Sequence, residues 1–444
     1  MPKHIPNNMP RPRSDTRYGS CSDELDKILA EAIAKHSLPK KEKMLLDGKI
    51  KEVISRIEQN IAKSRIKAKV ILGGSAAKGT TIKGDFDCDI FVAFDLSMKN
   101  YNLSKTLFDL VKSFRFEEVH GSRDYYRIMH KGVKYEIIPV LDVKDSKQAV
   151  NVTDMSPLHV DWVMSRVRKD PGLTDEMLLS KIFCKAQDLY GAESYIKGFS
   201  GHVLDILTMN YGGFIALLKA SQSWKKGDVI DVEHHYKAGD AGKRMNSSKT
   251  QSPIIVVDPI MPERNAAASL SDERFMRFRQ AAASFLDAPS QDFFQKKVLN
   301  HADFVRKHKG RKIIELRIWP LDGKDDVVGS KMLKSLDFLK TVLKLNDFRL
   351  LDFSWQWKDD PAVAFFVFDR DPLARKKTWL GPPLNAEKNA DLFMKKHKET
   401  FVDKGRVCAL VEREFITPGS LIRNTIKNSY VTERTKRISV QEHG

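Results

Sequence analysis

Cysteine is scarce in this sequence, and its few cysteines stand far apart. The four are Cys21, Cys88, Cys184 and Cys408. None has a second cysteine at the short spacing that structural zinc sites use, so the sequence contains no cysteine-based zinc motif. Scattered thiols of this kind are typical of proteins in a reducing compartment, and we therefore expect a cytoplasmic protein.

Long hydrophobic runs are also lacking. No apolar stretch reaches the roughly 18 residues that a membrane-spanning helix requires. Residues 1–21 are polar and rich in proline, without the apolar segment of a signal peptide, so we expect a flexible basic arm there. The sequence thus predicts a protein that does not act in a membrane.

Acidic residues are too few to balance the basic ones. The sequence has 76 Lys and Arg against 58 Asp and Glu, which gives a formal net charge of +18. A protein this basic commonly binds a polyanion, and nucleic acid is the first candidate; a basic surface without such a partner is the alternative. At 444 residues, 41% of them hydrophobic, the chain is long enough for roughly three domains of about 150 residues each.

Helical and extended patterns both recur along the chain, which predicts an α+β fold without an internal repeat. Apolar residues at helical spacing indicate helices near residues 22–38, 46–61, 177–191, 212–224, 272–286, 330–345 and 385–399. Extended apolar patterns indicate strands near residues 68–72, 88–94, 133–140, 254–260, 311–319 and 362–370. We expect domain boundaries near residues 150 and 290.

One short segment concentrates residues suited to binding a metal ion. The sequence GGSAAKGTTIKGDFDCDIFVAF, residues 73–94, carries Asp85, Asp87 and Asp89 at alternate positions before an apolar strand. Residues two apart on a strand point the same way, so Asp87 and Asp89 project from one face. Two carboxylates aimed at one point suit a hard divalent cation, Mg²⁺ above all. We interpret Asp85, which follows Gly84, as a turn residue.

The start of the same segment is suited to binding a phosphate group. Gly73 and Gly74 allow close backbone approach, and Ser75 lies at the start of a predicted helix whose N-terminus favours an anion. Lys78, one turn further on, adds a positive charge. A nucleoside triphosphate with its Mg²⁺ fits both halves of the segment.

A third carboxylate stands in a later predicted strand. Glu136 interrupts the apolar sequence VKYEIIPV, where an unpaired acid is costly to bury. Phosphoryl transfer with two metal ions about 3.5–4 Å apart normally requires such a third ligand, and Glu136 supplies it if its strand lies beside the first. The alternatives are a solvated strand edge for Asp87 and Asp89 and a lysine partner for Glu136. The joint pattern favours the metal site.

With these motifs the sequence resembles the nucleotidyltransferases of the polymerase β superfamily. It resembles most closely the archaeal-type, class I CCA-adding enzymes, which are tRNA nucleotidyltransferases. The resemblance covers most of residues 40–430, in family order, through the segments SPLHVDWV, KAQDLYGAESYIKGFSGHVLDIL, VVDPIMPERNAAASLS, APSQDFF and GPPLNAEKNADLFMKKHKE. It implies a mixed-sheet nucleotidyltransferase domain over residues 22–150, a helical nucleotide-binding neck over 151–290, and an α+β tRNA-binding body and tail over 291–444.

The resemblance also implies a reaction and the residues that perform it. The protein would add and repair the 3′-terminal CCA of tRNA from CTP and ATP, without a nucleic-acid template, and release pyrophosphate. The catalytic ligands of two Mg²⁺ ions would be Asp87, Asp89 and Glu136. The residues that contact the nucleotide would be Gly74, Ser75, Lys78, His159, Lys185, Ser194 and Arg264.

Three positions depart from the pattern of the family. Glu136 stands where Asp is common, so the carboxylate keeps its charge but moves by one methylene. Lys78 stands where Arg is familiar and lacks the bidentate geometry of a guanidinium. Ser194 follows YGAE where a tyrosine is familiar, with Tyr195 next to it.

Several of the implied nucleotide contacts have ordinary explanations when each residue is considered alone. Arg264 would suit a surface ion pair with Glu263 or another neighbour. His159 would suit a helix cap or a core position, and Lys185 would suit a solvated helix face. The family motifs, and not these residues singly, favour the nucleotide pocket.

The last third of the chain combines aromatic and basic residues that suit RNA. These residues are Trp355, Trp357, Arg370, Arg375, Lys376, Lys377 and Trp379. We expect Trp355 and Trp357 in a core, and a basic face that follows the phosphates of the tRNA acceptor stem and elbow. The rival interpretations are a poly(A) polymerase-like RNA nucleotidyltransferase and an RNA-binding protein with an inactive transferase domain. The sequence leaves the oligomeric state open, a homodimer included.

Overall fold

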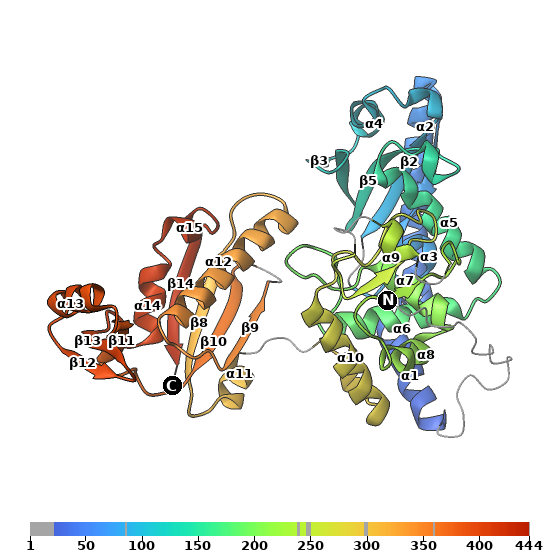
Figure 1. Cartoon of the computed structure of the whole chain (residues 1–444). Coiled ribbons are helices and arrows are strands. Elements are labelled where there is room, and N and C mark those ends of the chain that lie inside the picture. Colours follow the sequence, from blue (N-terminus) through green and yellow to red (C-terminus); the bar gives the residue numbers. More distant parts are fainter. Residues whose placement is uncertain are drawn as a thin grey trace. The chain divides into compact units, whose positions relative to one another are not determined.

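The computed structural model describes residues 22–84, 87–237, 240–245, 250–296, 301–357 and 360–443. The chain splits into two compact units, residues 1–297 and 298–444, and Figure 1 shows the elements of each. The expected basic arm and Asp85 lie outside the described residues, so what we expect of them stays a prediction.

The first unit contains a mixed sheet and two groups of helices. Its described helices are α1 (Ser22–His36), α2 (Lys40–Ser64), α3 (Gly74–Lys78), α4 (Leu103–Val111), α5 (Ser156–Val167), α6 (Leu173–Ala186), α7 (Gly201–Tyr211), α8 (Phe214–Ser221), α9 (Ala241–Arg244) and α10 (Asp272–Asp287). Its described strands are β1 (Ala68–Leu72), β2 (Cys88–Phe94), β3 (Phe116–Val119), β4 (Tyr125–His130), β5 (Val133–Leu141), β6 (Asp228–Ile230) and β7 (Ile254–Val256).

The main sheet has the strand order β1-β2-β5-β4-β3. Only the pairing of β2 with β5 is parallel within this described sheet; the other three pairings are antiparallel. Strands β1 and β2 have the predicted bounds, and β5 ends one residue later than predicted. Strands β3 and β4 were not predicted, because they are short and carry charged residues among their apolar ones.

The alternation of residues along β2 decides which face of the sheet is covered. Cys88, Ile90 and Val92 share a hydrophobic cluster with the apolar stripe of α2 and with α4. Phe91 and Ala93 point the other way, and they pack with residues of α3 and α5 in a smaller cluster. The acidic residues at the start of β2 therefore stand opposite the face that α2 and α4 cover.

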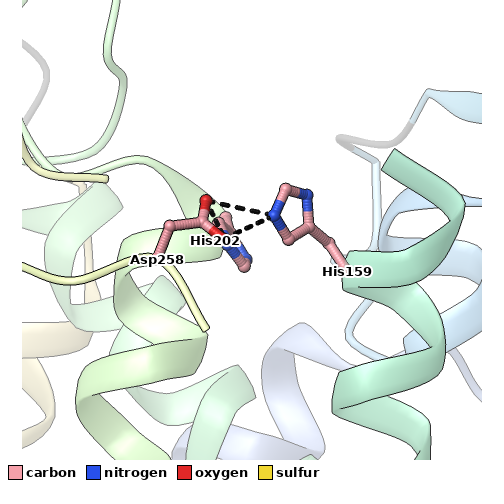
Figure 2. Close-up of side chains that lie close together, drawn as sticks. All are labelled: His159, His202 and Asp258. Carbon is pink, nitrogen blue, oxygen red and sulfur yellow. Dashed lines mark hydrogen bonds and ion pairs between the residues drawn. The ribbon is translucent and has the colours of Figure 1, made fainter. Parts of the chain in front are cut away.

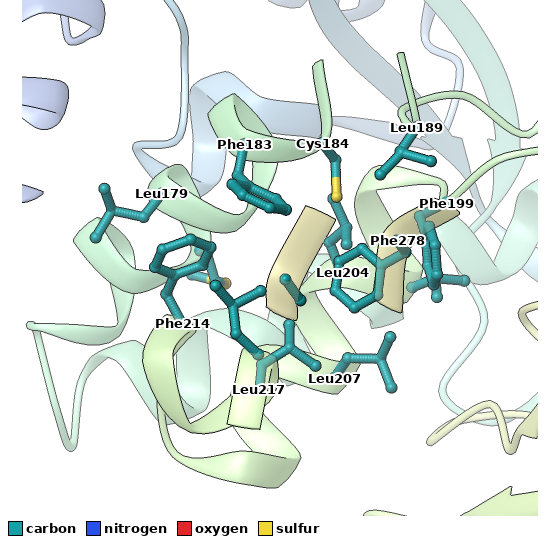
Figure 3. Close-up of a cluster of buried hydrophobic side chains, with 14 of the residues drawn as sticks. Leu179, Phe183, Cys184, Leu189, Phe199, Leu204, Leu207, Phe214, Leu217 and Phe278 are labelled. Carbon is teal, nitrogen blue, oxygen red and sulfur yellow. The ribbon is translucent and has the colours of Figure 1, made fainter. Parts of the chain in front are cut away.

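The second hydrophobic core of the first unit is helical. Figure 3 shows Phe183, Phe199, Phe214 and Phe278 packed with leucines of α6, α7 and α8. Helix α1 joins this helical core, although it precedes the sheet in the sequence. No single described helix is long and apolar enough to cross a membrane; α7 and α8 together pass that test but form a pair bent by 90° within this core.

The second unit is also α+β. Its described helices are α11 (His301–Lys307), α12 (Asp325–Leu345), α13 (Glu387–Lys396), α14 (Pro418–Thr425) and α15 (Ser429–Thr432). Its described strands are β8 (Lys312–Trp319), β9 (Asp352–Gln356), β10 (Ala362–Phe368), β11 (Lys376–Pro383), β12 (Thr400–Asp403), β13 (Arg406–Glu412) and β14 (Arg437–His443).

Two antiparallel sheets organise the second unit. In the larger sheet, of order β14-β8-β10-β9, one face packs on α12 and α14 and the other on α11. The smaller sheet, of order β11-β13-β12, packs on α13. Trp355 and Trp357 pack against the core of the larger sheet, as expected. The α+β class predicted from the sequence is confirmed in both units.

Candidate active site

The predicted acidic residues meet where β2 and β5 lie side by side. Asp89 is the register partner of Glu136 in the parallel pairing of these strands, so both side chains point to the same face. Asp87 lies two residues before Asp89, just outside β2. The expectation that the strand of Glu136 lies beside that of Asp89 is confirmed.

The pKa of Asp89 reflects its burial and its proximity to the other two acids. Burial and the negative charges of Glu136 and Asp87 raise the pKa of Asp89 to about 6. The ammonium groups of Lys78 and Lys181 act in the opposite direction. Three carboxylates and two lysines therefore lie within electrostatic reach of one another.

Basic side chains balance two of the three carboxylates. Lys134 Nζ lies 2.9 Å from Asp87 Oδ1, and Arg127 Nη2 donates to Glu136 Oε1 at 3.2 Å. Arg127 is the register partner of Glu136 on the antiparallel side of β5. Glu136 thus stands between a carboxylate on β2 and a guanidinium on β4.

The glycine turn after β1 brings the backbone against Asp89. Gly73 N donates to Asp89 O at 2.8 Å, and Gly74 has a φ of +56° at the start of α3. A Cβ on Gly74 would lie 1.8 Å from Asp89 Oδ2, and a Cβ on Gly73 would meet the ring of Phe91. Glycine is therefore required at both positions, as the predicted close approach demands. The predicted helix is a single turn, Gly74–Lys78, and contains Ser75.

Lys78 is already paired in the structure. Its Nζ lies 2.6 Å from Asp205 Oδ2, and both side chains are nearly buried. Asp205 belongs to α7, so the pair links the glycine turn to the helical core. Lys78 also influences both Asp89 and His202 electrostatically, which places its charge between the acidic residues and α7.

Helix α6 adds two lysines one turn apart. Lys181 Nζ donates to Thr80 O at 3.2 Å, just beyond the end of α3. The ammonium groups of Lys181 and Lys185 lie 5.8 and 4.8 Å from the ring centroid of Tyr190. Ser194 lies in the turn that follows Tyr190 and is exposed.

Asp258, which the sequence analysis did not single out as a site residue, joins two of the predicted nucleotide contacts. Its buried carboxylate accepts from Arg264 Nη1 at 2.7 Å and contacts His159 Nε2 at 2.9 and 3.0 Å. Figure 2 shows His159 and Asp258 pointing toward one another, with His202 beside the carboxylate. His202 Nε2 lies 3.7 Å from Asp258 Oδ2, beyond hydrogen-bond distance.

The turn after β7 fixes the orientation of this carboxylate. Asp258 Oδ1 accepts from the backbone N–H groups of Ile260 and Met261 at 3.0 and 3.1 Å. Asp258 N in turn donates to Arg264 O at 3.0 Å, which closes the loop. Arg264 is thereby held both at its backbone carbonyl and at its guanidinium, and 38% of its side chain is exposed. Arg264 does form an ion pair, but its partner is the buried Asp258, and its contact with a nucleotide stays a prediction.

The pKa values of Asp258 and His202 are both lowered, for different reasons. Burial alone would raise the pKa of Asp258, but its contacts with His159 and His202 hold that pKa well below the usual range. Burial lowers the pKa of His202 to about 4, because a charged imidazolium is poorly solvated there. At neutral pH the cluster therefore holds an ionised Asp258 and a neutral His202.

Asp87, Asp89 and Glu136 offer carboxylate oxygens, the donor type that a hard divalent cation prefers, and Asp89 and Glu136 offer them from one face of the sheet. Burial first, and then the negative charges of Glu136 and Asp87, raise the pKa of Asp89. The donor atoms of His159, His202 and Asp258 also lie within 4.8 Å of one another. Because Arg264 and two backbone N–H groups already bind that carboxylate, we interpret this second cluster as a positioning cluster.

Comparison with known proteins identifies the family. Three family models match this chain: a nucleotidyltransferase domain over residues 49–150, the second domain of tRNA nucleotidyltransferases over 175–295, and the C-terminal domain of CCA-adding enzymes over 309–438. The CCA-adding enzyme of Nanoarchaeum equitans is 32% identical, over 85% of this chain and 92% of that relative. The chain belongs to the family of CCA-adding enzymes.

Further members of the CCA-adding family match nearly the whole chain. The CCA-adding enzyme of Methanocaldococcus jannaschii is 30% identical, over 95% of this chain and 97% of that relative. That of Thermococcus gammatolerans is 28% identical, over 91% and 94%. Among solved structures, a cytoplasmic RNA terminal U-transferase matches 62% of this chain with 13% identity and a TM-score of 0.47.

Six residues at the site of this family member escaped the sequence analysis. They are Arg127, Lys134, Lys181, His202, Asp205 and Asp258. His202 and Asp205 lie in the quoted segment GFSGHVLDIL, and Asp258 precedes Arg264 by six residues in another quoted segment. Lys181 is one helical turn before Lys185, so helical spacing was the available signal.

Proposed function

We infer that this chain adds and repairs the 3′-terminal CCA of tRNA, using CTP and ATP without a nucleic-acid template. The observation that carries the proposal is the register pairing of Asp89 with Glu136 on the face that also presents Asp87, beside the glycine turn. Membership of the CCA-adding family supports the substrate, and the carboxylate geometry supports the reaction type.

We propose that Asp87, Asp89 and Glu136 bind two Mg²⁺ ions. When bound there, Mg²⁺ lowers the pKa of the attacking hydroxyl and neutralises charge on the leaving pyrophosphate. In the reaction the terminal 3′-hydroxyl of the RNA loses its proton to solvent, and its oxygen bonds to the α-phosphorus. The bond from that phosphorus to its bridging oxygen breaks, and pyrophosphate leaves. Arg127 donates a hydrogen bond to Glu136 and so orients its carboxylate.

The basic groups around the glycine turn are placed to hold the triphosphate. Gly74 and Ser75 offer backbone N–H groups, and Lys78 and Lys181 offer charge within electrostatic reach of Asp89. Because Asp205 pairs with Lys78, a triphosphate competes with Asp205 for the same ammonium group. Lys185, next to Tyr190, and Ser194, in the following turn, extend this surface.

The Asp258 cluster is placed to define the other end of the nucleotide pocket. His159 and Arg264 reach it from α5 and from the turn after β7, and Asp258 fixes both side chains. The planar guanidinium of Arg264 offers donors to base edges or phosphates. We propose that Arg264 contacts the base of CTP or ATP and that His159 contacts the rest of the nucleotide.

The second unit is proposed to hold the acceptor stem and elbow of tRNA. Trp379 is 51% exposed on β11, and Lys377 Nζ lies 5.3 Å from its ring centroid. Exposed aromatic and basic side chains of this kind bind RNA without reading its sequence, which suits an enzyme that serves many tRNAs.

The described cysteines Cys88, Cys184 and Cys408 are buried free thiols, in keeping with a cytoplasmic setting.

The test is nucleotide addition to a tRNA transcript that ends at its discriminator base. The full chain with Mg²⁺ is expected to add two cytidines from CTP alone and to complete CCA when ATP is also present. A transcript extended by adenosines alone would favour the poly(A) polymerase-like alternative.

A single substitution distinguishes catalysis from RNA binding alone. Asp89→Asn is expected to lower the rate of addition by at least about 100-fold, because it removes a shared metal ligand. It is also expected to raise the unfolding temperature in EDTA at pH 8, because it removes a negative charge that Glu136 and Asp87 repel. Unchanged addition by Asp89→Asn would contradict the proposed site and favour an inactive transferase domain.

A further inference from the structure

A second cluster of potential metal ligands lies in the second unit, separate from the acidic residues of the first. Glu315 stands in the apolar strand β8 with its side chain 3% exposed. Its carboxylate Oε2 lies 2.6 Å from His301 Nδ1 and 3.2 Å from His443 Nε2. The two imidazole rings have centroids 4.4 Å apart. Three different elements thus bring one donor atom each to the same point.

The register of the larger sheet explains why these side chains meet. Glu315 pairs with Phe365 on β10 and with Gln441 on β14, so His443, two residues beyond Gln441, points to the same face. Helix α11 covers this face through Phe304, whose ring stacks on Phe365. His301 begins α11 and so reaches Glu315 from above the sheet.

One oxygen of the Glu315 carboxylate is already bound by a basic side chain. Arg317 Nε donates to the other oxygen, Oε1, at 2.9 Å. Oε1 is therefore used by a guanidinium that orients the group, while Oε2 faces the two imidazole nitrogens.

We propose that His301, Glu315 and His443 bind one divalent transition-metal ion of the Zn²⁺ type. Their donor atoms lie within 4.8 Å of one another, and a tetrahedral zinc ion needs ligand atoms about 3.3–3.5 Å apart. Binding would therefore lengthen the 2.6 Å distance between His301 Nδ1 and Glu315 Oε2 and bring all three donor atoms to that spacing by side-chain rotation. Two imidazoles and one carboxylate are a ligand set that this class of ion favours over Mg²⁺.

An opening beside the cluster gives the ion a route and a fourth coordination position. A cavity of about 480 Å³ is lined by His301 and Ile313 together with seven of the residues between them, from Ala302 to Arg311. The side chain of His301 is 44% exposed. Water can therefore complete the coordination shell from the side of α11.

The ion would join the two ends of the second unit to its central strand. His301 and His443 lie close to the first and last residues of this unit, residues 298 and 444, while Glu315 lies on β8 between β14 and β10. A cross-link between ends so far apart in sequence restricts the unfolded chain strongly and stabilises the fold. We assign the site a structural role, distinct from the nucleotidyl transfer proposed for the first unit.

The test is zinc binding by the full chain after removal of metals with EDTA. Zn²⁺ is added in the presence of excess Mg²⁺, and bound zinc is counted after dialysis. Wild type is expected to bind one more Zn²⁺ per chain than His301→Ala, Glu315→Gln or His443→Gln. At Zn²⁺ concentrations 100 times the Kd, its unfolding temperature is expected to rise by on the order of 5 °C. Bound Co²⁺ is expected to show the intense visible bands of tetrahedral coordination.

The control is His397→Ala, in the same unit but at the end of α13. It is expected to keep the zinc stoichiometry and the thermal shift of wild type. His301→Ala is expected to keep the rate of nucleotide addition with Mg²⁺, so a failed zinc test and a failed transfer assay remain distinguishable. Equal zinc stoichiometry in wild type and all three cluster variants would overturn the proposal, as would an equal loss in His397→Ala.

Discussion

Asp258 is the residue at which two separate parts of the first unit meet. It contacts His159 of α5 and Arg264 of the turn after β7, and the backbone N–H groups of Ile260 and Met261 fix its carboxylate. Neither His159 nor Arg264 is positioned by its own element alone. Asp258 is therefore a positioning residue for the proposed nucleotide pocket.

Substitution of Asp258 is expected to affect nucleotide binding more than the chemical step. Asp258→Asn weakens a charge-assisted hydrogen bond to Arg264, so we expect KM for CTP and ATP to rise by about 10-fold, with a smaller change in kcat. Steady-state kinetics with each nucleotide measure this split. Asp272→Asn, which alters an exposed ion pair with Lys226, is the control and should behave as wild type. Unaltered KM values in Asp258→Asn would contradict the assignment.

The buried His202 predicts a specific loss of stability in acid. Its folded-state pKa is about 4 against an ordinary 6.5, so the folded state resists protonation that the unfolded chain accepts. The free energy of unfolding of the first unit should therefore fall as the pH drops from about 6.5 toward 4, by up to about 3 kcal/mol.

Denaturant titrations at several pH values measure the contribution of His202. His202→Gln should lose this part of the pH dependence, because a neutral amide has no proton to gain. His120→Gln is the control, because the side chain of His120 is 77% exposed in the same unit. If the free energy of unfolding depends on pH equally in wild type and His202→Gln, another group controls the loss of stability in acid.

At the scale of elements, the glycine turn between β1 and α3 is the feature that depends most on exact residue type. Its backbone lies against Asp89, so the turn and this proposed metal ligand form one unit. Helix α3 is too short to form alone and is held by its contacts with β2 and α5. Substitutions in this turn are therefore expected to change the rate of nucleotide addition directly.

Two glycines with similar backbone conformations allow a matched test of this turn. Gly74→Ala places a Cβ 1.8 Å from Asp89 Oδ2, whereas Gly132→Ala meets nothing within 4 Å, and both residues have positive φ. Both variants pay about 1 kcal/mol for backbone strain. Only Gly74→Ala is expected to lower the rate of nucleotide addition, by at least about 100-fold, because it displaces Asp89. Equal rates in the two variants would contradict the proposed role of the turn.

At the scale of the whole molecule, charge is the dominant property. The formal net charge of +18 favours encounter with RNA before any specific contact forms. We propose that Trp379, which is exposed, and Lys377, which is half-buried, form a local binding surface on β11 of the second unit. Affinity for tRNA should therefore depend mainly on phosphates and little on sequence.

Salt dependence of tRNA binding tests this view. We expect log K to fall linearly with log salt concentration, with a slope of about 0.7 to 0.9 for each phosphate contacted. Lys377→Gln should weaken binding of different tRNAs equally and reduce the slope by about one contact. Thr378→Ala, an uncharged neighbour, should leave the slope unchanged. Binding that is insensitive to salt in wild type would contradict a phosphate-based surface.

The sequence by itself determined the elements that local pattern controls. The apolar alternation of β1, β2 and β5 fixed their bounds to within a residue, and the alternate spacing of Asp87 and Asp89 fixed their common direction. The family motifs added the membership and the reaction. These features depend on neighbours in the chain, and neighbours are visible in a sequence.

Only the tertiary structure decided which distant residues share a site. Asp205 pairs with Lys78 across 127 positions, and Asp258 binds His159 across 99. Glu315 likewise meets His443 across 128 positions. A buried charge must find a partner when the core closes, and that partner is selected by helix packing and strand register rather than by local spacing. For this reason the carboxylates proposed for the active site could be named from the sequence, whereas the residues that pair with or position the site residues could not.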